Sequence, residues 1–160
     1  MFIIQHRRRR ELKTNYRNRL ALIKSNKVRL VIRKRLDNIS VQFVEYNPEG
    51  DRTLASAFSP ELKKFNWSFS TGSIPAAYLT GLLAGKKAKS KIKEAVLDIG
   101  LHTSTKGSRI YAALKGVLDV GIVVPHSQEI LPNENRIKGL HIKGDVSKVF
   151  ENVKSKIMGP

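Results

Sequence analysis

The feature that most constrains this chain is a dense basic segment near its N-terminus, from Arg7 to Arg35. It holds thirteen of the thirty Lys and Arg residues and a single acid, Glu11. Outside it the chain carries a surplus of only five positive charges. Like charges packed this closely repel one another and seldom add stability, so a polyanion is the expected partner. The sequence therefore points to nucleic acid.

Length and composition exclude several other classes of protein. The 160 residues are about the size of one domain and can bury roughly 70% of the surface of the unfolded chain. The absence of cysteine excludes disulfides, thiolate zinc sites and a cysteine nucleophile, and fits an intracellular setting. The longest apolar-leaning run, Ile74 to Gly85, is shorter than the roughly twenty residues of a membrane helix. We expect a soluble protein with no membrane partner.

The N-terminal residues predict an arm followed by a helix. Arg7 to Arg10 should stay extended until an anion neutralises them. From Glu11 onward, apolar residues recur at helical spacing up to Ser25-Asn26: Leu12, Tyr16, Leu20 and Ile23. The alternative is a solvated helix whose arginine stems only cover apolar surface. We interpret residues 1–26 as a basic arm and helix, and residues 27–160 as an α/β RNA-binding domain.

The next segments predict a three-stranded antiparallel meander. Lys27 to Arg35 alternates apolar and basic residues, which makes one face of this strand basic. Ile39 to Tyr46 has the β-branched and aromatic content of a second strand, and Asn47 to Gly50 is a turn. Arg52 to Phe58 is the third strand.

The middle of the chain predicts a short turn and a long helix. Ser59-Pro60-Glu61 should form a single helical turn. The aromatic residues Phe65, Trp67 and Phe69 have no basic residues among them, so we expect them in the core rather than stacked on bases. A helix from Ser73 and Pro75 to about Ala88 carries a stripe of small residues that should pack closely on the sheet: Ala77, Gly81 and Gly85. The lysines from Lys86 to Lys93 either contact RNA or form a solvated face.

A second strand–helix–strand unit follows. Glu94 to Gly100 predicts a buried strand, and a helix should run from Arg109 to about Val120. Ile122 to Val124 should be a strand parallel to the one at Ala95. The polar loop before the helix, with Lys106 and Arg109, predicts either an rRNA phosphate site or a plain helix cap, and it lacks the glycine-lysine-serine order of a P-loop.

The last segments complete a single α/β domain with a mixed sheet. Pro132 to Gly144 should be mostly irregular, and Asp145 should cap a final helix. That helix has an apolar stripe facing the core: Val146, Val149, Phe150, Val153 and Ile157. A meander followed by a βαβ unit is the predicted architecture.

The same order of elements is typical of ribonuclease-H-like nucleases, so an enzyme has to be considered. Two-metal cleavage needs several carboxylates from neighbouring strands, but the first strand has none and Asp98 is the only acid within the apolar, buried part of the fourth. We expect it to accept hydrogen bonds, for example from the Thr103 to Thr105 loop. The four histidines have no metal-ligand spacing: His6, His102, His126 and His141. We predict no catalysis, metal, cofactor or small-molecule substrate. Besides the nuclease, two rival hypotheses are a nonspecific basic RNA-binding protein and a membrane-surface protein.

Several blocks in one order, over about residues 7–142, identify a family by resemblance: Arg7 to Glu11, Thr14 to Tyr16, Arg29 to Lys34, Thr53 to Ala57, Pro75 to Gly81, Ala95 to Gly100, Lys106 to Arg109, Pro125-His126, Arg136-Ile137 and His141-Ile142. The chain resembles the 5S-rRNA-binding large-subunit ribosomal protein numbered eighteen in the universal scheme, in its archaeal form. The resemblance implies a ribonuclease-H-like topology without catalysis. It also implies a place in the cytoplasmic ribosome, with 5S rRNA, 23S rRNA and neighbouring proteins of the central protuberance as partners.

The predicted RNA-binding residues come from the basic segment and from the loop before the second long helix. They are Arg7, Arg8, Arg9, Arg10, Lys13, Tyr16, Arg17, Arg19, Lys24, Arg29, Arg33, Lys34, Arg35, Lys106 and Arg109. The arginine block is expected to enter RNA grooves and the others to neutralise phosphates. Tyr16 either stacks on a base or packs in the apolar face of its helix.

Overall fold

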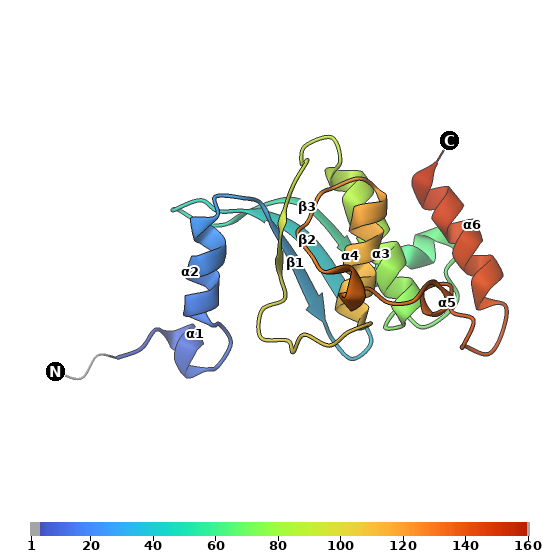
Figure 1. Cartoon of the computed structure of the whole chain (residues 1–160), viewed down its shortest axis with the longest axis horizontal. Coiled ribbons are helices and arrows are strands. Elements are labelled where there is room, and N and C mark those ends of the chain that lie inside the picture. Colours follow the sequence, from blue (N-terminus) through green and yellow to red (C-terminus); the bar gives the residue numbers. More distant parts are fainter. Residues whose placement is uncertain (1–3, 160) are drawn as a thin grey trace.

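A four-stranded mixed sheet forms the centre of the computed structural model, which describes residues 4–159 (Figure 1). Its strands are β1 (Arg29–Lys34), β2 (Ile39–Glu45), β3 (Arg52–Phe58) and β4 (Val96–Asp98), in the order β3-β2-β1-β4. The pairs β1–β2 and β2–β3 are antiparallel, and β4 runs parallel to β1. The predicted meander and mixed α/β class are therefore confirmed.

The register of the sheet separates an apolar face from a polar one. Leu30 pairs with Phe43 and Ile32 with Val41, and all four are fully buried. Because neighbouring side chains of a strand point to opposite faces, Val31 and its partner Gln42 lie on the other face. Helices cover the apolar face, and the polar face is the one that α2 approaches (Figure 1).

Two helices with buried glycines pack on the apolar face: α3 (Ile74–Ala88) and α4 (Arg109–Asp119). A Cβ added at Gly81 would overlap the backbone of Ala113, and one added at Gly116 would overlap the carbonyl oxygen of Tyr78. The small-residue stripe of α3 therefore brings its backbone against α4. The prediction that this stripe packs on the sheet is wrong, because the glycines are used where two helices meet.

The remaining elements are short helices and one long C-terminal helix: η1 (Ser59–Phe65), η2 (Gln128–Ile130), α5 (Glu134–Ile137) and α6 (Val146–Met158). The apolar stripe of α6 is buried as predicted, apart from the partly buried Val149. Asp145 precedes α6 but makes no capping hydrogen bond, and its carboxylate pairs with Lys148 at 3.3 Å instead. The seven-residue η1 is longer than the single turn expected.

The aromatic cluster after η1 belongs to the core, as predicted. Trp67 is 3% exposed, and its ring meets that of Phe69 edge-on at a centroid distance of 5.7 Å. Phe65 and Phe69 are partly buried against the same core. These rings therefore stabilise the fold and are not a surface for stacking bases.

The N-terminal segment differs from its prediction in two ways. Arg7–Arg10 forms a helical turn, α1, instead of an extended arm, because Glu11 forms ion pairs with Arg7 and Lys13 and so offsets part of the repulsion. The helix α2 (Tyr16–Lys24) starts later than expected, because the side chain of Asn15 accepts a hydrogen bond from the N–H of Asn18 and caps it there.

The predicted fifth strand is reduced to one contact. Val123 forms a single parallel bridge with Glu94, and the N–H of Ala95 donates to the carbonyl of Val123. The direction expected for Ile122 to Val124 is therefore correct, but no strand forms there among the described residues.

Candidate nucleic-acid interface

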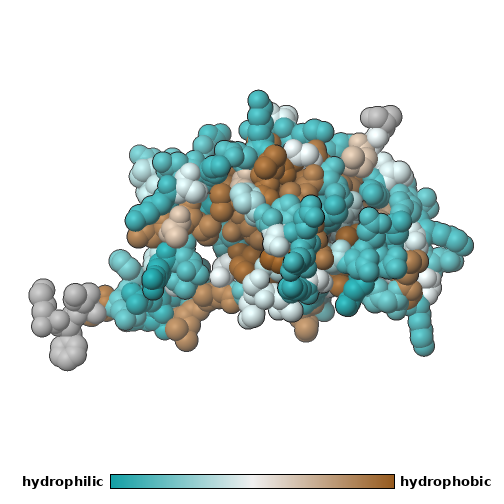
Figure 2. Space-filling model, in the orientation of Figure 1, coloured by the Kyte–Doolittle hydropathy of each residue, from teal (hydrophilic) through white to brown (hydrophobic). Residues whose placement is uncertain are grey.

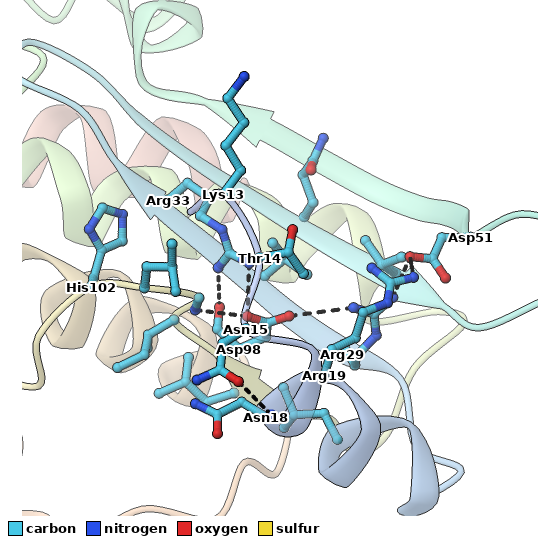
Figure 3. A pocket seen from close by; sticks show the side chains of 18 of the residues that line it. Lys13, Thr14, Asn15, Asn18, Arg19, Arg29, Arg33, Asp51, Asp98 and His102 are labelled. Atoms are coloured by element: carbon cyan, nitrogen blue, oxygen red, sulfur yellow. Dashed lines mark hydrogen bonds and ion pairs between the residues drawn. The ribbon is translucent and has the colours of Figure 1, made fainter. Parts of the chain in front are cut away.

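The helix α2 stands beside the polar face of the sheet and is held there by charge. None of the described residues of α2 is buried. Arg19 on α2 donates to the carboxylate of Asp51 at 2.8 Å, and Arg29 on β1 reaches the same oxygen at 2.7 Å. Asp51, in the turn before β3, thus joins the projecting helix to the sheet (Figures 1 and 3).

A second acid, Asp98, organises the arginines of β1. Asp98 pairs with Val31 in the parallel register, so Arg29 and Arg33 lie on either side of it on the same face. The Nη2 atom of Arg33 lies 2.8 Å from one carboxylate oxygen, and Nη1 of Arg29 lies 3.4 Å from the other. Asp98 also accepts from the N–H of Gly100. The prediction that Asp98 accepts hydrogen bonds is confirmed by the backbone N–H of Gly100, but the donors are not those of the Thr103 to Thr105 loop, because β4 places the carboxylate beside two guanidinium groups.

Between α2 and the sheet lies a groove of about 680 Å³ (Figure 3). Five of the residues that line it are basic and two are acidic: Arg8, Lys13, Arg19, Arg29, Arg33, Asp51 and Asp98. The acids hold the arginines in place without cancelling their charge, so the groove stays positive. Figure 2 shows hydrophilic side chains over most of the adjoining projection.

The charges of the groove shift two titratable groups. Burial alone raises the pKa of Asp51, but hydrogen bonds and charge from Arg29 and then Arg19 outweigh it and hold that pKa below its ordinary value. Burial lowers the pKa of His102, and Lys34, Arg33 and Arg109 lower it further. His102, which lines the groove, is therefore neutral at pH 7 and surrounded by positive charge.

The predicted RNA-binding residues differ in their exposure. The exposed set is Arg7, Arg8, Arg9, Arg10, Lys13, Arg17, Lys24 and Arg35. Arg19 and Arg33 are partly exposed and paired with acids, and Lys34 and Tyr16 are partly buried. Arg29 is only 3% exposed and is held by Asp51 and Asp98. A direct phosphate contact from Arg29 does not fit this burial, because β4 and the turn before β3 enclose its side chain.

The basic residues of the loop before α4 have local partners. Arg109 donates from Nη1 to the carbonyls of Leu36 and Gly72, each at 2.9 Å, and so ties the β1–β2 turn to the start of α3. Lys106 pairs with Glu129 at 3.1 Å, with both side chains largely exposed. Arg109 therefore stabilises the fold. Lys106 forms only a weak surface ion pair and can exchange it for a phosphate.

Sequence reasoning missed the two acids of the site. Asp51, between the predicted turn and the third strand, was given no role, and Asp98 was expected only to accept hydrogen bonds. The only indication in the sequence was the excess of arginines on one strand face, which have to find acceptors wherever they are buried. Within residues 4–159 there is no group of His, Asp and Glu that could hold a metal ion. In the same range, no helix has the length and apolar character needed to cross a bilayer.

Comparison with known proteins identifies the family. The model of the family "Ribosomal large subunit proteins 60S L5, and 50S L18" matches residues 1–95 and 89–127. The chain belongs to this family. A relative from Korarchaeum cryptofilum is 56% identical over 149 residues, which cover 92% of this chain and 76% of the relative. One from Methanothrix thermoacetophila is 49% identical over 161 aligned positions, or 98% of this chain and 95% of the relative.

A third relative, from Methanococcus maripaludis, is 49% identical over 94% of this chain and 79% of its own length. All three carry the name "Large ribosomal subunit protein uL18". The family confirms the resemblance inferred from the sequence blocks and places the chain in the large ribosomal subunit, where it works with rRNA and other proteins. It also confirms that the chain is not an enzyme, since these relatives are structural ribosomal proteins.

Proposed function

We propose that this protein binds 5S rRNA, anchors it in the central protuberance of the large subunit and also contacts 23S rRNA. The observation that carries this proposal is the continuous basic surface formed by α1, α2 and the groove beside β1. The surface is built on one end of a chain that belongs to a large-subunit family. Neighbouring proteins of the central protuberance are the other proposed partners.

The proposed mechanism is scaffolding by charge and shape. The exposed arginines of α1 neutralise phosphates at the end of the N-terminal projection. Along the α1–α2 turn and α2, phosphates are neutralised by Lys13, Arg17 and Lys24. Arg19 and Arg33 are aimed by Asp51 and Asp98, so they meet RNA in fixed positions. Recognition rests mainly on RNA shape and 2′-hydroxyl groups, because side chains cannot read the deep, narrow major groove of an A-form helix.

Two structural assignments accompany the proposed function. Residues 1–26 act as a basic projection, and residues 27–160 as the α/β RNA-binding domain; Val28 and Leu30 are the first residues that join the core. The topology is assigned as ribonuclease-H-like, supported by the strand order β3-β2-β1-β4 and the parallel bridge at Val123.

Lys106 and Lys34 are proposed as secondary phosphate contacts at the edge of the basic surface.

The test compares binding of the full chain to 5S rRNA and to a tRNA in a salt series. We expect a clear preference for 5S rRNA that is lost when residues 1–26 are removed. The truncated chain should still fold, because the buried core contains no residue of that segment. Equal affinity for both RNAs would favour a nonspecific basic RNA-binding protein and would contradict the proposed 5S rRNA function.

A further inference from the structure

A second, smaller pocket lies at the base of the N-terminal projection and adjoins the charged groove, with which it shares Thr14, Asn15 and Leu101. It has a volume of about 380 Å³ and lies between the α1–α2 turn and the loop that follows β4. Leu12, Tyr16 and Leu101 provide apolar surface in this pocket, and Arg9, Arg17 and Asn15 provide polar groups. Pockets of roughly 300 to 1,000 Å³ with apolar walls and a few polar groups are typical of small-ligand sites.

The two leucines of this pocket are exposed. Leu12 is 82% exposed and Leu101 is 57% exposed. Figure 2 shows apolar side chains at the surface between the projection and the body. Leu12 also has a φ of 51°, in the left-handed region that a branched residue rarely adopts. A strained backbone that keeps an apolar side chain exposed to water does not stabilise the folded chain. Such strain is typical of binding sites.

The charges around the pocket favour one kind of occupant. Among residues 4–159, Arg9 and Arg17 line it and no carboxylate does, in contrast to the groove with its two acids. The nearest acid in sequence, Glu11, is engaged by Arg7 and Lys13. Apolar residues together with two arginines suit a flat base that carries a phosphate, whereas an apolar protein side chain would leave both cations without a partner.

Polar groups beside the apolar wall can contact the edge of a base. Asn15 uses its side-chain oxygen to cap α2, and its NH₂ group has no partner among residues 4–159. The ring of Tyr16 is held by His6, with the two ring centroids 5.3 Å apart. A donor and a positioned aromatic ring next to apolar walls match the way proteins hold unstacked bases.

We propose that this pocket receives one unpaired nucleotide of RNA, with its base against Leu12, Leu101 and Tyr16 and its phosphate between Arg9 and Arg17. The inference rests on the proposed RNA-binding function and deepens it, because it assigns a single-nucleotide site next to the phosphate-binding surface. The groove beside β1 holds backbone, and this pocket holds a base.

The experiment uses the full chain, a paired RNA hairpin whose two strands are joined by a non-nucleotide linker, and the same hairpin with one unpaired nucleotide in its stem, prepared with each of the four bases. We expect the chain to bind the best hairpin with an unpaired nucleotide about tenfold more tightly than the paired one. The variant Leu12→Ala/Leu101→Ala should lose this preference while keeping its affinity for the paired hairpin and its salt dependence. Both leucines are exposed, so folding should not suffer.

The matched control is Leu36→Ala/Leu140→Ala, which removes two leucines that are 85% and 61% exposed and lie outside the pocket. This control should keep the preference. The proposal is overturned if the unsubstituted chain binds all hairpins equally, or if the pocket variant keeps the preference. A preference for 5S rRNA over tRNA that survives in both double variants, without any preference for the unpaired nucleotide, would sustain the proposed function and refute only the pocket.

Discussion

At the scale of single residues, the site depends on two carboxylates that position arginines. Asp98 is 7% exposed and contacts both Arg29 and Arg33, and Asp51 joins Arg29 to Arg19. Buried ion pairs often add little stability relative to apolar residues, but they become costly when one partner is removed. Their value here is that they aim Arg19 and Arg33 at the groove.

Replacing Asp98 with asparagine should therefore destabilise the fold. Arg29 would keep only Asp51 as a charged partner, and we expect the free energy of unfolding to fall by about 2 to 3 kcal/mol. Urea unfolding followed by the fluorescence of Trp67 measures this. The control Asp145→Asn breaks an exposed pair with Lys148 and should change the value by less than about 0.5 kcal/mol. Equal effects of the two substitutions would mean that Asp98 has no such role.

His102 should make RNA binding depend on pH. Its pKa is lowered in the free chain by burial and by the basic residues near it. Phosphates placed in the groove would raise that pKa, so binding takes up a proton and affinity should rise about three- to tenfold as the pH falls from about 7.5 to 5.5. Titrations of 5S rRNA at several pH values measure the change.

The variant His102→Gln should lose most of this pH dependence, whereas His141→Gln, at an exposed position, should keep it. The lowered pKa of His102 also makes the stability of the fold depend on pH. Because folding lowers the pKa, the unfolded chain binds more protons, and the contribution of His102 to stability falls as the pH drops below about 6.5. An unchanged pH dependence in His102→Gln would show that RNA does not approach this side chain.

At the scale of secondary-structure elements, α3 and α4 meet with their backbones in close contact. Glycines on both helices remove the side chains that would separate the two backbones. Start and stop residues predicted α3 and α4 correctly, and the apolar stripe predicted α6. These signals could not predict which neighbour the glycine stripe of α3 meets, because that depends on how the helices are arranged in space.

Two alanine substitutions four residues apart on α3 test this contact. Gly81→Ala places a methyl group against the backbone of Ala113 and should lower the free energy of unfolding by about 2 kcal/mol or more. Gly85→Ala meets the side chain of Val120 at 3.1 Å and gains helix propensity of about 1 kcal/mol, so the two effects should nearly cancel. Thermal unfolding of the two variants measures the difference, and Gly81→Ala should have the lower melting temperature. Similar melting temperatures would contradict the close backbone contact.

The start of α2 shows where periodicity alone was misleading. Leu12 has the right spacing for the apolar face of α2, yet it lies in the turn before the helix. The capping residue Asn15 was visible in the sequence and would have placed the boundary correctly. The four arginines form a turn instead of an extended arm because Glu11 pairs with Arg7 and offsets part of their repulsion. Local polar contacts decided both outcomes.

At the scale of the whole molecule, charge is concentrated at one end. The projection of α1 and α2 carries the exposed arginines, and α6 lies at the opposite end (Figure 1). A molecule of this kind is expected to orient on a polyanion before close contacts form. Affinity should therefore depend steeply on salt.

If about six phosphates are neutralised, the logarithm of affinity for 5S rRNA should fall with the logarithm of salt at a slope of roughly −4 to −5. The variant Arg17→Ala/Lys24→Ala/Arg35→Ala should reduce the magnitude of that slope by about 2 to 3. The remote triple variant Lys63→Ala/Lys64→Ala/Lys148→Ala removes the same charge and should leave it unchanged. A slope near zero for the unsubstituted chain would exclude phosphate contacts as the basis of binding.

The sequence by itself determined the basic segment, the meander, the long helices and the members of the core, because charge density, alternation and helical spacing are local properties of the chain. The tertiary structure alone decided that Arg29 is buried and that Leu12 and Leu101 share a pocket. It also decided that Asp51 and Asp98 orient Arg19 and Arg33. These contacts join residues far apart in the chain. They depend on the parallel register of β4 and on the position of α2 against the sheet, which no local pattern encodes.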